Sequence, residues 1–289
     1  MATTRTNPTK TQHKKGGERK APPAASSNGS SPEQRETLRK LYACLLRSRE
    51  IQKRLQARVG LPVYELSLGH EAVVVGTTAD LECEDTITAC RWNVAALIAR
   101  RVPWKALLAA GAADEACACE ARATVAHTSL PQDPFHLGTG IALAHRLENK
   151  HRVVVAFGGQ VESPLEAWHI ALKFAGVHKL PILYVIQNGG GTAAEQPAHL
   201  EAISFMARDC GFPGVVVDAQ DVVAVWRVAQ ESIVRARNGA GPTLIDCRSD
   251  GARDPLAHME HYLRKRDLWD EAWREQTAAR ISQELEVVK

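Results

Sequence analysis

The stretch from His151 to Gly191, HRVVVAFGGQVESPLEAWHIALKFAGVHKLPILYVIQNGGG, decides the fold that this sequence predicts. An apolar, β-branched run at 153–157 meets a pair of glycines, a helical segment follows, and a second apolar run at 182–186 ends in a polar turn. Strand, glycine turn, helix and strand is the order in which an open α/β sheet presents a helix N-terminus to a phosphate. The stretch therefore predicts a parallel sheet with a phosphate-binding edge.

The glycine turn carries an amide where a metal-bound diphosphate needs an acid. Gly158 and Gly159 are followed by Gln160, and Glu162 is the nearby carboxylate. Magnesium prefers hard oxygen ligands, usually including about one or two carboxylates besides the phosphates. The sequence thus predicts the frame of a diphosphate site but no metal-ligating residue, and it singles out no catalytic residue.

Helices and strands alternate regularly from Leu137 onward, which predicts a doubly wound parallel sheet with helices on both faces. The stretch 111–134 has no clean period and is predicted to be a long loop. The expected helices are 138–148, 164–176, 199–209 and 221–237, with strands at 153–157, 182–187, 214–218 and 243–247; upstream we expect a helix from Pro32, helices at 65–81, 94–101 and 104–110, and a strand at 85–90.

Local signals set several helix boundaries. Ser163, with proline next and Glu166 three residues on, forms a capping-box pattern. Asp221 is expected to cap the following long helix, and Asn238-Gly239 to end it. His136 and His169 lie at a helix start and inside a helix, and both are interpreted as structural.

Charge and composition divide the chain into a tail and one domain. Residues 1–31 hold six Lys/Arg against one Glu, a net of +5 within a chain of +3, so the remainder is close to neutral at −2. We expect residues 1–31 to be a disordered basic tail. Residues 32–289 are expected to form a single domain with its core at 60–250 and a helical C-terminal arm at 254–289.

Composition also narrows the class of partner. The tail has no aromatic residue and no amphipathic period, so neither nucleic acid nor membrane is expected as a partner. The seven cysteines are interpreted as reduced thiols of a cytoplasmic protein. Cys117, Cys119 and His127 do not match a zinc spacing, so we interpret the two thiols as a buried, inert pair.

Several blocks of the chain resemble the alpha subunit of the thiamine-diphosphate-dependent 2-oxo acid dehydrogenases, which include the pyruvate, branched-chain and acetoin enzymes. The resemblance covers roughly residues 60–289, and its GHEA, KLP and GPTLID blocks are individually distinctive. The matching blocks are LGHEAVVVGTTADL (68–81), ARRVPWKALLA (99–109), GIALAHRLENKHRVVVAF (140–157), EAWHIALKFAGVHKLPILYVIQN (166–188), CGFPGVVVDAQDVVAVW (210–226), RARNGAGPTLIDC (235–247) and DPLAHMEHYLRKRDLWDEAW (254–273).

This resemblance implies a thiamine-diphosphate-binding fold and an oxidoreductase that acts on an oxo group with a disulfide acceptor. It implies thiamine diphosphate and Mg²⁺ as cofactors, shared in a heterotetramer with a beta subunit. A homodimer is the alternative assembly, and the acyltransferase core of the complex is a further implied partner. The cofactor-binding positions that it implies are Arg91, Gly158, Gly159, Gln160, Glu162 and Asn188.

The chain departs from the family pattern at both magnesium side chains. The Asp of the family's Gly-Asp-Gly turn falls on Gln160, or on Gly159 if the alignment shifts by one residue. The second Asn of its Asn-Asn pair falls on Gly189, while Asn188 matches the first. The histidine-containing loops of the family have no counterpart in 111–134 or in 248–253. These departures predict that binding of the magnesium diphosphate is impaired or absent.

Three hypotheses follow. The first is a non-catalytic paralogue that keeps the fold and its interfaces for assembly or regulation. The second is a working alpha subunit that performs oxidative decarboxylation with a beta partner. The third is a reuse of the fold to bind another anion at the helix terminus near 163–166.

Overall fold

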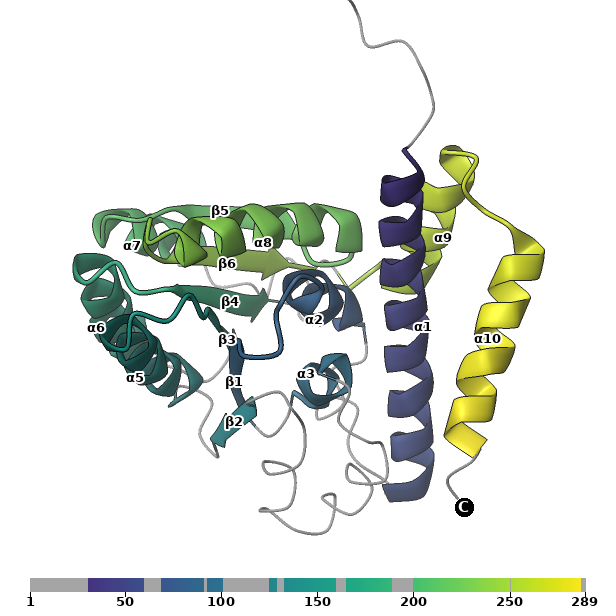
Figure 1. Ribbon diagram of the computed structural model, residues 1–289, viewed down its shortest axis with the longest axis horizontal. Coiled ribbons are helices and arrows are strands. Elements are labelled where there is room, and N and C mark those ends of the chain that lie inside the picture. Colours follow the sequence, from purple (N-terminus) through teal and green to yellow (C-terminus); the bar gives the residue numbers. More distant parts are fainter. Residues whose placement is uncertain are drawn as a thin grey trace, which may run out of the picture.

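The computed structural model describes residues 31–59, 69–90, 93–100, 125–128, 133–159, 165–188, 200–249 and 251–286. Within them lies one six-stranded sheet, in the order β2-β1-β3-β4-β6-β5, and every neighbouring pair is parallel (Figure 1). The predicted fold class is confirmed. The strands are β1 (Thr86–Cys90), β2 (Val125–Thr128), β3 (Val154–Gly159), β4 (Ile182–Asn188), β5 (Gly214–Asp218) and β6 (Thr243–Arg248).

Helices cover both faces because successive strand residues point to opposite sides. On β3, Val154 and Ala156 belong to one buried cluster, and Val155 and Phe157 belong to another. The first cluster includes residues of α5 (Asp133–Leu147), α6 (Leu165–Val177) and α7 (Leu200–Asp209). The second includes residues of α2 (Glu71–Thr78), α3 (Val94–Ala99) and α8 (Val222–Arg237).

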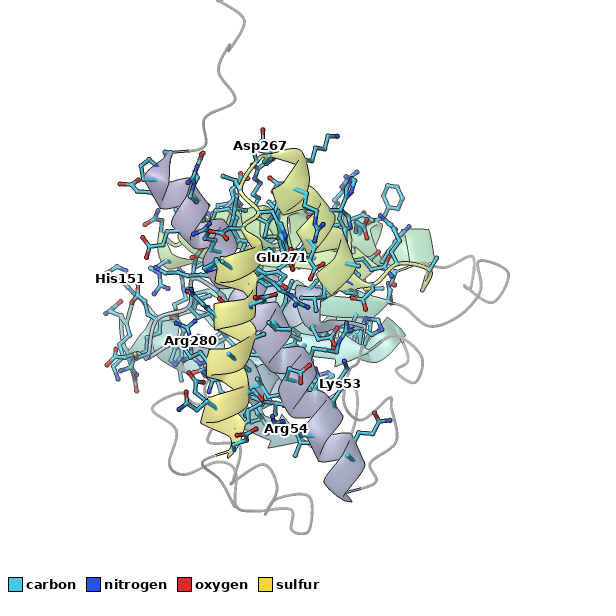
Figure 2. The ribbon with its side chains drawn as sticks, turned by 90° about the vertical axis from the view of Figure 1, so that its right-hand side faces the viewer. Lys53, Arg54, His151, Asp267, Glu271 and Arg280 are labelled. Carbon is cyan, nitrogen blue, oxygen red and sulfur yellow. The ribbon has the colours of Figure 1, made fainter. Side chains whose placement is uncertain are left out.

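Three further helices form the helical arms at one end of the molecule (Figure 1). They are α1 (Pro32–Val59), α9 (Pro255–Lys265) and α10 (Glu271–Glu286). Tyr42 of α1 joins them: its ring lies 5.4 Å from the rings of both Trp269 and Trp273, and its hydroxyl donates to Glu260 at 2.9 Å. Burial raises the pKa of Tyr42, so this hydroxyl remains a donor. Figure 2 shows α1 and α10 side by side on the surface.

The GHEA block supplies a buried acid that ties the arms to the sheet domain. Glu71 is 1% exposed and accepts hydrogen bonds from Arg49 of α1 and from the backbone N–H of Gly69. The same arginine pairs with Asp254, the N-cap of α9, at 2.8 Å. Burying a carboxylate is costly unless it is paired. The ion pair with Arg49 therefore explains how Glu71 can be buried, and it gives this acid a structural role.

Two sequence-based boundaries were wrong. The expected loop at 111–134 contains β2, which pairs with β1 in register, and helix α5 begins at Asp133 rather than at residue 138. Gly138 lies inside this helix. A Cβ atom there would lie 2.8 Å from Oγ1 of Thr88 and 3.1 Å from the Cβ of Ala156, so the glycine allows α5 to approach the sheet closely.

Other boundaries agree with expectation. Asp221 caps α8 by accepting from the N–H groups of Val223 and Ala224, and Gly239 follows the helix with a φ of +74°. The expected helix at 65–81 is shorter in the described residues, where α2 spans Glu71–Thr78. Ser163, the expected helix at 104–110 and the tail at 1–30 lie outside the described residues.

Candidate functional site at the carboxyl edge of the sheet

The chain reverses its direction of winding between β1 and β3, which are neighbours in the sheet. After β1 the chain enters α3 on one face, and after β3 it enters α6 on the opposite face. Open α/β sheets bind ligands outside the carboxyl ends of their strands at such a switch point. The carboxyl end of β3 carries Gly158 and Gly159, so the fold brings these two predicted residues to the expected place.

The two glycines have different surroundings. A Cβ atom on Gly158 would lie 2.9 Å from Cε1 of Phe135, a fully buried ring that packs against Trp168 and Tyr184 at 4.8 and 4.9 Å. A Cβ atom on Gly159 would meet no atom of the described residues within 4 Å, and this residue is exposed. Gly158 therefore serves core packing, whereas Gly159 leaves free space at the carboxyl edge, where a ligand would approach.

Asn188 is directed into the core rather than toward solvent. Its side chain is 1% exposed, and its Nδ2 donates to Oδ1 of Asp246 on β6. The other carboxylate oxygen of Asp246 accepts from Nε of Arg248 at 2.8 Å. Burial raises the pKa of Asp246, and the hydrogen bonds from Arg248 and Asn188 act in the opposite direction. The buried acid at this edge is thus occupied by two partners.

The carbonyl oxygen of the Asn188 side chain is different. Oδ1 is buried and has no hydrogen-bond partner among the described residues. A buried acceptor of this kind costs about 1–3 kcal/mol when unsatisfied. It is a buried side-chain oxygen at this edge with unused hydrogen-bonding capacity.

A hydrogen bond between two amide side chains, Asn93 and Gln187, spans the edge on the opposite face. Asn93 caps α3 by accepting from Ala96 N at 3.2 Å, and its Nδ2 donates to Oε1 of Gln187 at 3.2 Å. This bond links the start of α3 to the end of β4, close to the switch point. The described part of the edge is therefore lined by neutral amides on both faces.

Three of the six predicted site residues, Arg91, Gln160 and Glu162, lie outside the described residues, as does Gly189. Asp246 was not among the predicted site residues, although a single acid inside the apolar strand TLIDC is a signal for a buried, paired carboxylate. His136 and His169 are both exposed, so neither is packed in the core. Cys117 and Cys119 also fall outside the described residues.

The described residues of this edge include no carboxylate that is free to hold a metal ion. No group of three or more His, Cys, Asp or Glu among them is placed to hold a metal ion. Asp246 is fully buried and paired, and Asp218 at the end of β5 pairs with Arg253 at 2.9 Å. The part of the edge that the structure describes offers an amide oxygen and glycine backbone, but no free carboxylate.

The architecture defines a doubly wound α/β protein of the class that binds ligands at the carboxyl edge of a parallel sheet. The family comparison is more specific, because the pattern described as "Dehydrogenase E1 component" matches residues 40–249. The chain belongs to this dehydrogenase E1 family. None of the helices in the described ranges is long and apolar enough to span a membrane.

Three relatives illustrate the similarity. The alpha subunit of acetoin:2,6-dichlorophenolindophenol oxidoreductase from Bacillus subtilis is 31% identical over 196 residues, covering 63% of this chain and 59% of the relative. The alpha subunit of 3-methyl-2-oxobutanoate dehydrogenase from Mycobacterium tuberculosis (H37Rv) is 29% identical over 288 residues, covering 85% and 75%. The pyruvate dehydrogenase E1 alpha subunit of Bacillus subtilis is 26% identical over 273 residues, covering 81% and 70%.

Among solved structures, a match is described as a thiamin diphosphate-dependent enzyme from Mycobacterium smegmatis. It is 18% identical, has a TM-score of 0.40, and covers 62% of this chain and 31% of the matched chain.

Proposed function

We propose that this chain is an alpha-subunit-like protein of a 2-oxo acid dehydrogenase assembly that binds thiamine diphosphate and Mg²⁺ weakly or not at all. In this proposal it acts as a non-catalytic assembly or regulatory subunit beside a beta partner. The observation that carries the proposal is the pairing of Asp246 with Arg248 and Asn188. Both oxygens of this buried carboxylate already accept hydrogen bonds, and the carboxylate lies at the edge of the sheet where the family is expected to hold its cofactor.

The energetic argument is electrostatic. A Mg²⁺ ion holding a diphosphate needs oxygen ligands, and carboxylates are the usual protein contribution. Freeing Asp246 for this role would leave the Arg248 guanidinium and the Asn188 amide without their acceptor. Loss of groups that merely support a metal ligand costs about 10–100-fold in affinity, so replacement of the ligands at Gln160 and Gly189 should cost at least as much.

The alternative is an active alpha subunit, and one observation favours it. The unpaired Oδ1 of Asn188 and the open space at Gly159 are features that a bound ligand would use. In that case, thiamine diphosphate would supply the carbanion chemistry when bound. Arg91, Asn188 and Glu162 would hold the diphosphate, with the Glu162 carboxylate in place of the absent acid. The anion-binding hypothesis at 163–166 rests on residues outside the described ranges.

Calorimetric titration tests the proposal directly. The full chain, alone and mixed with a beta partner, should show no magnesium-dependent binding of thiamine diphosphate at micromolar concentrations. An alpha subunit with an intact Gly-Asp-Gly turn serves as the positive control under the same conditions. Stoichiometric, magnesium-dependent heat from the unmodified chain would refute the proposal.

A variant designed to regain binding tests whether the missing magnesium ligands cause the weak or absent binding of thiamine diphosphate. Gln160→Asp combined with Gly189→Asn should restore measurable binding, because it returns both magnesium side chains. Gln160→Asn with Gly189→Ala is the matched control, since it alters the same positions without adding a carboxylate at 160 or an amide at 189. If the first variant folds with a beta partner and still binds nothing, losses outside these two positions dominate.

A further inference from the structure

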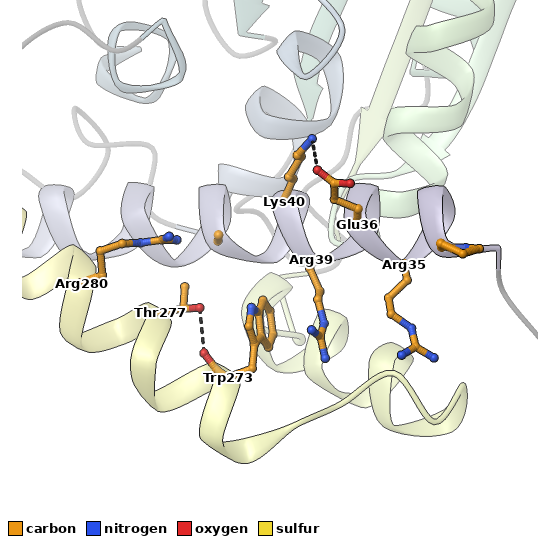
Figure 3. A pocket seen from close by; sticks show the side chains of 9 residues that line it. Arg35, Glu36, Arg39, Lys40, Trp273, Thr277 and Arg280 are labelled. Atoms are coloured by element: carbon orange, nitrogen blue, oxygen red, sulfur yellow. Dashed lines mark hydrogen bonds and ion pairs between the residues drawn. The ribbon is translucent and has the colours of Figure 1, made fainter.

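Helices α1 and α10 of the arms border an open groove that has no place in the proposed cofactor chemistry. It has a volume of about 540 Å³ and lies between α1 and the start of α10 (Figure 3). This volume falls in the range of about 300–1,000 Å³ that is usual for ligand sites. Its floor includes small and apolar positions at Pro32, Ala43 and Thr277, and the indole of Trp273 lines one side. We name it the arm groove.

Positive charge dominates the arm groove. Arg35, Arg39, Lys40 and Arg280 line it, against Glu36 as the one lining carboxylate. Glu36 is already paired with Lys40 at 2.7 Å. Figure 3 shows this pair along one margin, with Arg35, Arg39 and Trp273 along the other.

The arginines of the groove have unused hydrogen-bonding capacity. Nε of Arg39 is buried without a hydrogen-bond partner in the described residues, and the nearest carboxylate oxygen, on Asp270, lies 3.9 Å from its Nη2. Its guanidinium sits 4.8 Å from the centre of the Trp273 ring. Arg35 and Arg280 form no ion pair with an acid of the described chain. Buried donors normally have a partner, so the buried Nε of Arg39 and the two exposed guanidinium groups of Arg35 and Arg280 give the groove charged donors for an anionic ligand.

The positive ends of α1 and α10 lie near the groove, but acids offset them: Glu33 and Glu271 stand in the first turns, and Asp270 accepts from the N–H of Trp273. The positive field of the groove therefore comes from its arginine and lysine side chains. A second basic cavity of about 460 Å³ provides a contrast. It lies at the ends of α5, α6 and α8, whose C-terminal dipoles offset its cations, and its Arg237 is paired with Asp85 at 2.7 Å.

The geometry points to an extended acidic peptide of a partner protein as the occupant. From Pro32 to Ala43 the groove follows α1 for about 16 Å at 1.5 Å per residue, the length of about five extended residues. Arg35 and Arg39 are one helical turn apart, about 6 Å, which matches the spacing of about 6.6 Å between alternate side chains of an extended strand. A single phosphate would reach only part of this row of cations.

The segment of this chain that adjoins the groove is an unsuitable occupant. Residues 1–30 carry six Lys/Arg against one Glu and join α1 at its first residue. Repulsion between this positive segment and the positive groove disfavours its entry. The positive charge of the segment adds to the attraction of the groove for an acidic partner. We propose that the arm groove docks a carboxylate-rich segment of a partner protein, with Arg35 and Arg280 as its main contacts. This proposal does not depend on whether the chain binds thiamine diphosphate.

The test measures fluorescence anisotropy of a labelled peptide of alternating Glu and Ala residues with the full chain, at low ionic strength because exposed charges are screened within about 10 Å at 0.1 M salt. The unmodified chain should bind it, and the same peptide with Gln in place of Glu should not bind. Arg35→Gln with Arg280→Gln should weaken binding at least about tenfold, equivalent to about 1.4 kcal/mol.

Arg227→Gln with Lys265→Gln is the matched control. It also removes two exposed helical cations, on α8 and α9, and should change the affinity by less than about twofold. Urea midpoints of both double variants establish that they are folded, and Arg280→Gln alone provides a milder second variant. Equal losses in the two double variants would overturn the proposal, as would equal binding of the Gln peptide.

Competition identifies other occupants. Displacement of the peptide by equimolar inorganic phosphate would show a small-anion site and overturn the proposal. Displacement by a single-stranded oligonucleotide with the same dependence on Arg35 and Arg280 would favour nucleic acid instead. Dimerisation of the chain that is lost on mutation of these two arginines, seen by sedimentation, would assign the groove to a second copy. Persistence of peptide binding against both competitors, with no dimerisation that depends on these arginines, supports the proposal.

Discussion

Substitutions at Gly158 and Gly159 can distinguish two roles of the glycine turn, packing in the core at Gly158 and space for a ligand at Gly159. In Gly158→Ala, the added methyl group would start 2.9 Å from a carbon of Phe135, which is held between two other aromatic rings. An ordinary contact of about 3.4–4 Å requires the ring to shift by at least about 0.5 Å, and such overpacking typically costs about 1–3 kcal/mol. Neither glycine has a positive φ, so backbone strain does not add to this cost.

Gly159→Ala is the matched variant at the adjacent position. Its methyl group enters open space, and Gly→Ala in a strand gains about 0.5–1 kcal/mol when the backbone permits it. We therefore expect Gly158→Ala to lower the free energy of unfolding by about 1–3 kcal/mol and Gly159→Ala to leave it equal or slightly higher.

Urea unfolding followed by far-UV circular dichroism measures both effects, with the midpoint compared at unchanged m-value. Any ligand of this edge should bind Gly159→Ala less well, although the fold is intact. A Gly158→Ala protein with the midpoint of the unmodified chain, or a Gly159→Ala protein that is equally destabilised, would refute the packing argument.

Two further predictions concern stability. Gly176→Ala should destabilise the protein because its Cβ would collide with the backbone carbonyl of Cys210, whereas Gly140→Ala, in an open position inside α5, should stabilise it by up to about 1 kcal/mol; thermal unfolding of both variants checks this contrast. Asp246 has a pKa raised by burial, so its contribution to folding is greatest below its ordinary pKa and is lost as pH rises through the folded value. The free energy of unfolding of the native chain minus that of Asp246→Asn should therefore fall as the pH rises through the weakly acidic range, and a pH-independent difference in urea titrations would contradict the buried environment of this acid.

The sequence predicted the parts of the fold that depend on neighbouring residues. Alternating apolar runs and capped helices gave the parallel sheet from 153 to 248, and Asp221 was identified as a helix cap because its partners lie two and three residues away. The prediction of a loop at 111–134 was wrong because the strand within it depends on distant residues. Strand β2 has only four residues, and its identity depends on backbone pairing with β1 rather than on its own pattern.

For the candidate site, the sequence alone determined which residue types stand at each family position, including the amide of Gln160 and the two glycines. Only the tertiary structure placed the Asn188 amide against Asp246, which lies 58 residues away in the chain. The arm groove also arises only on folding, because α1 and α10 stand at opposite ends of the sequence. Local patterns encode helices and strands, but the partners of a buried polar group are chosen by packing between distant segments.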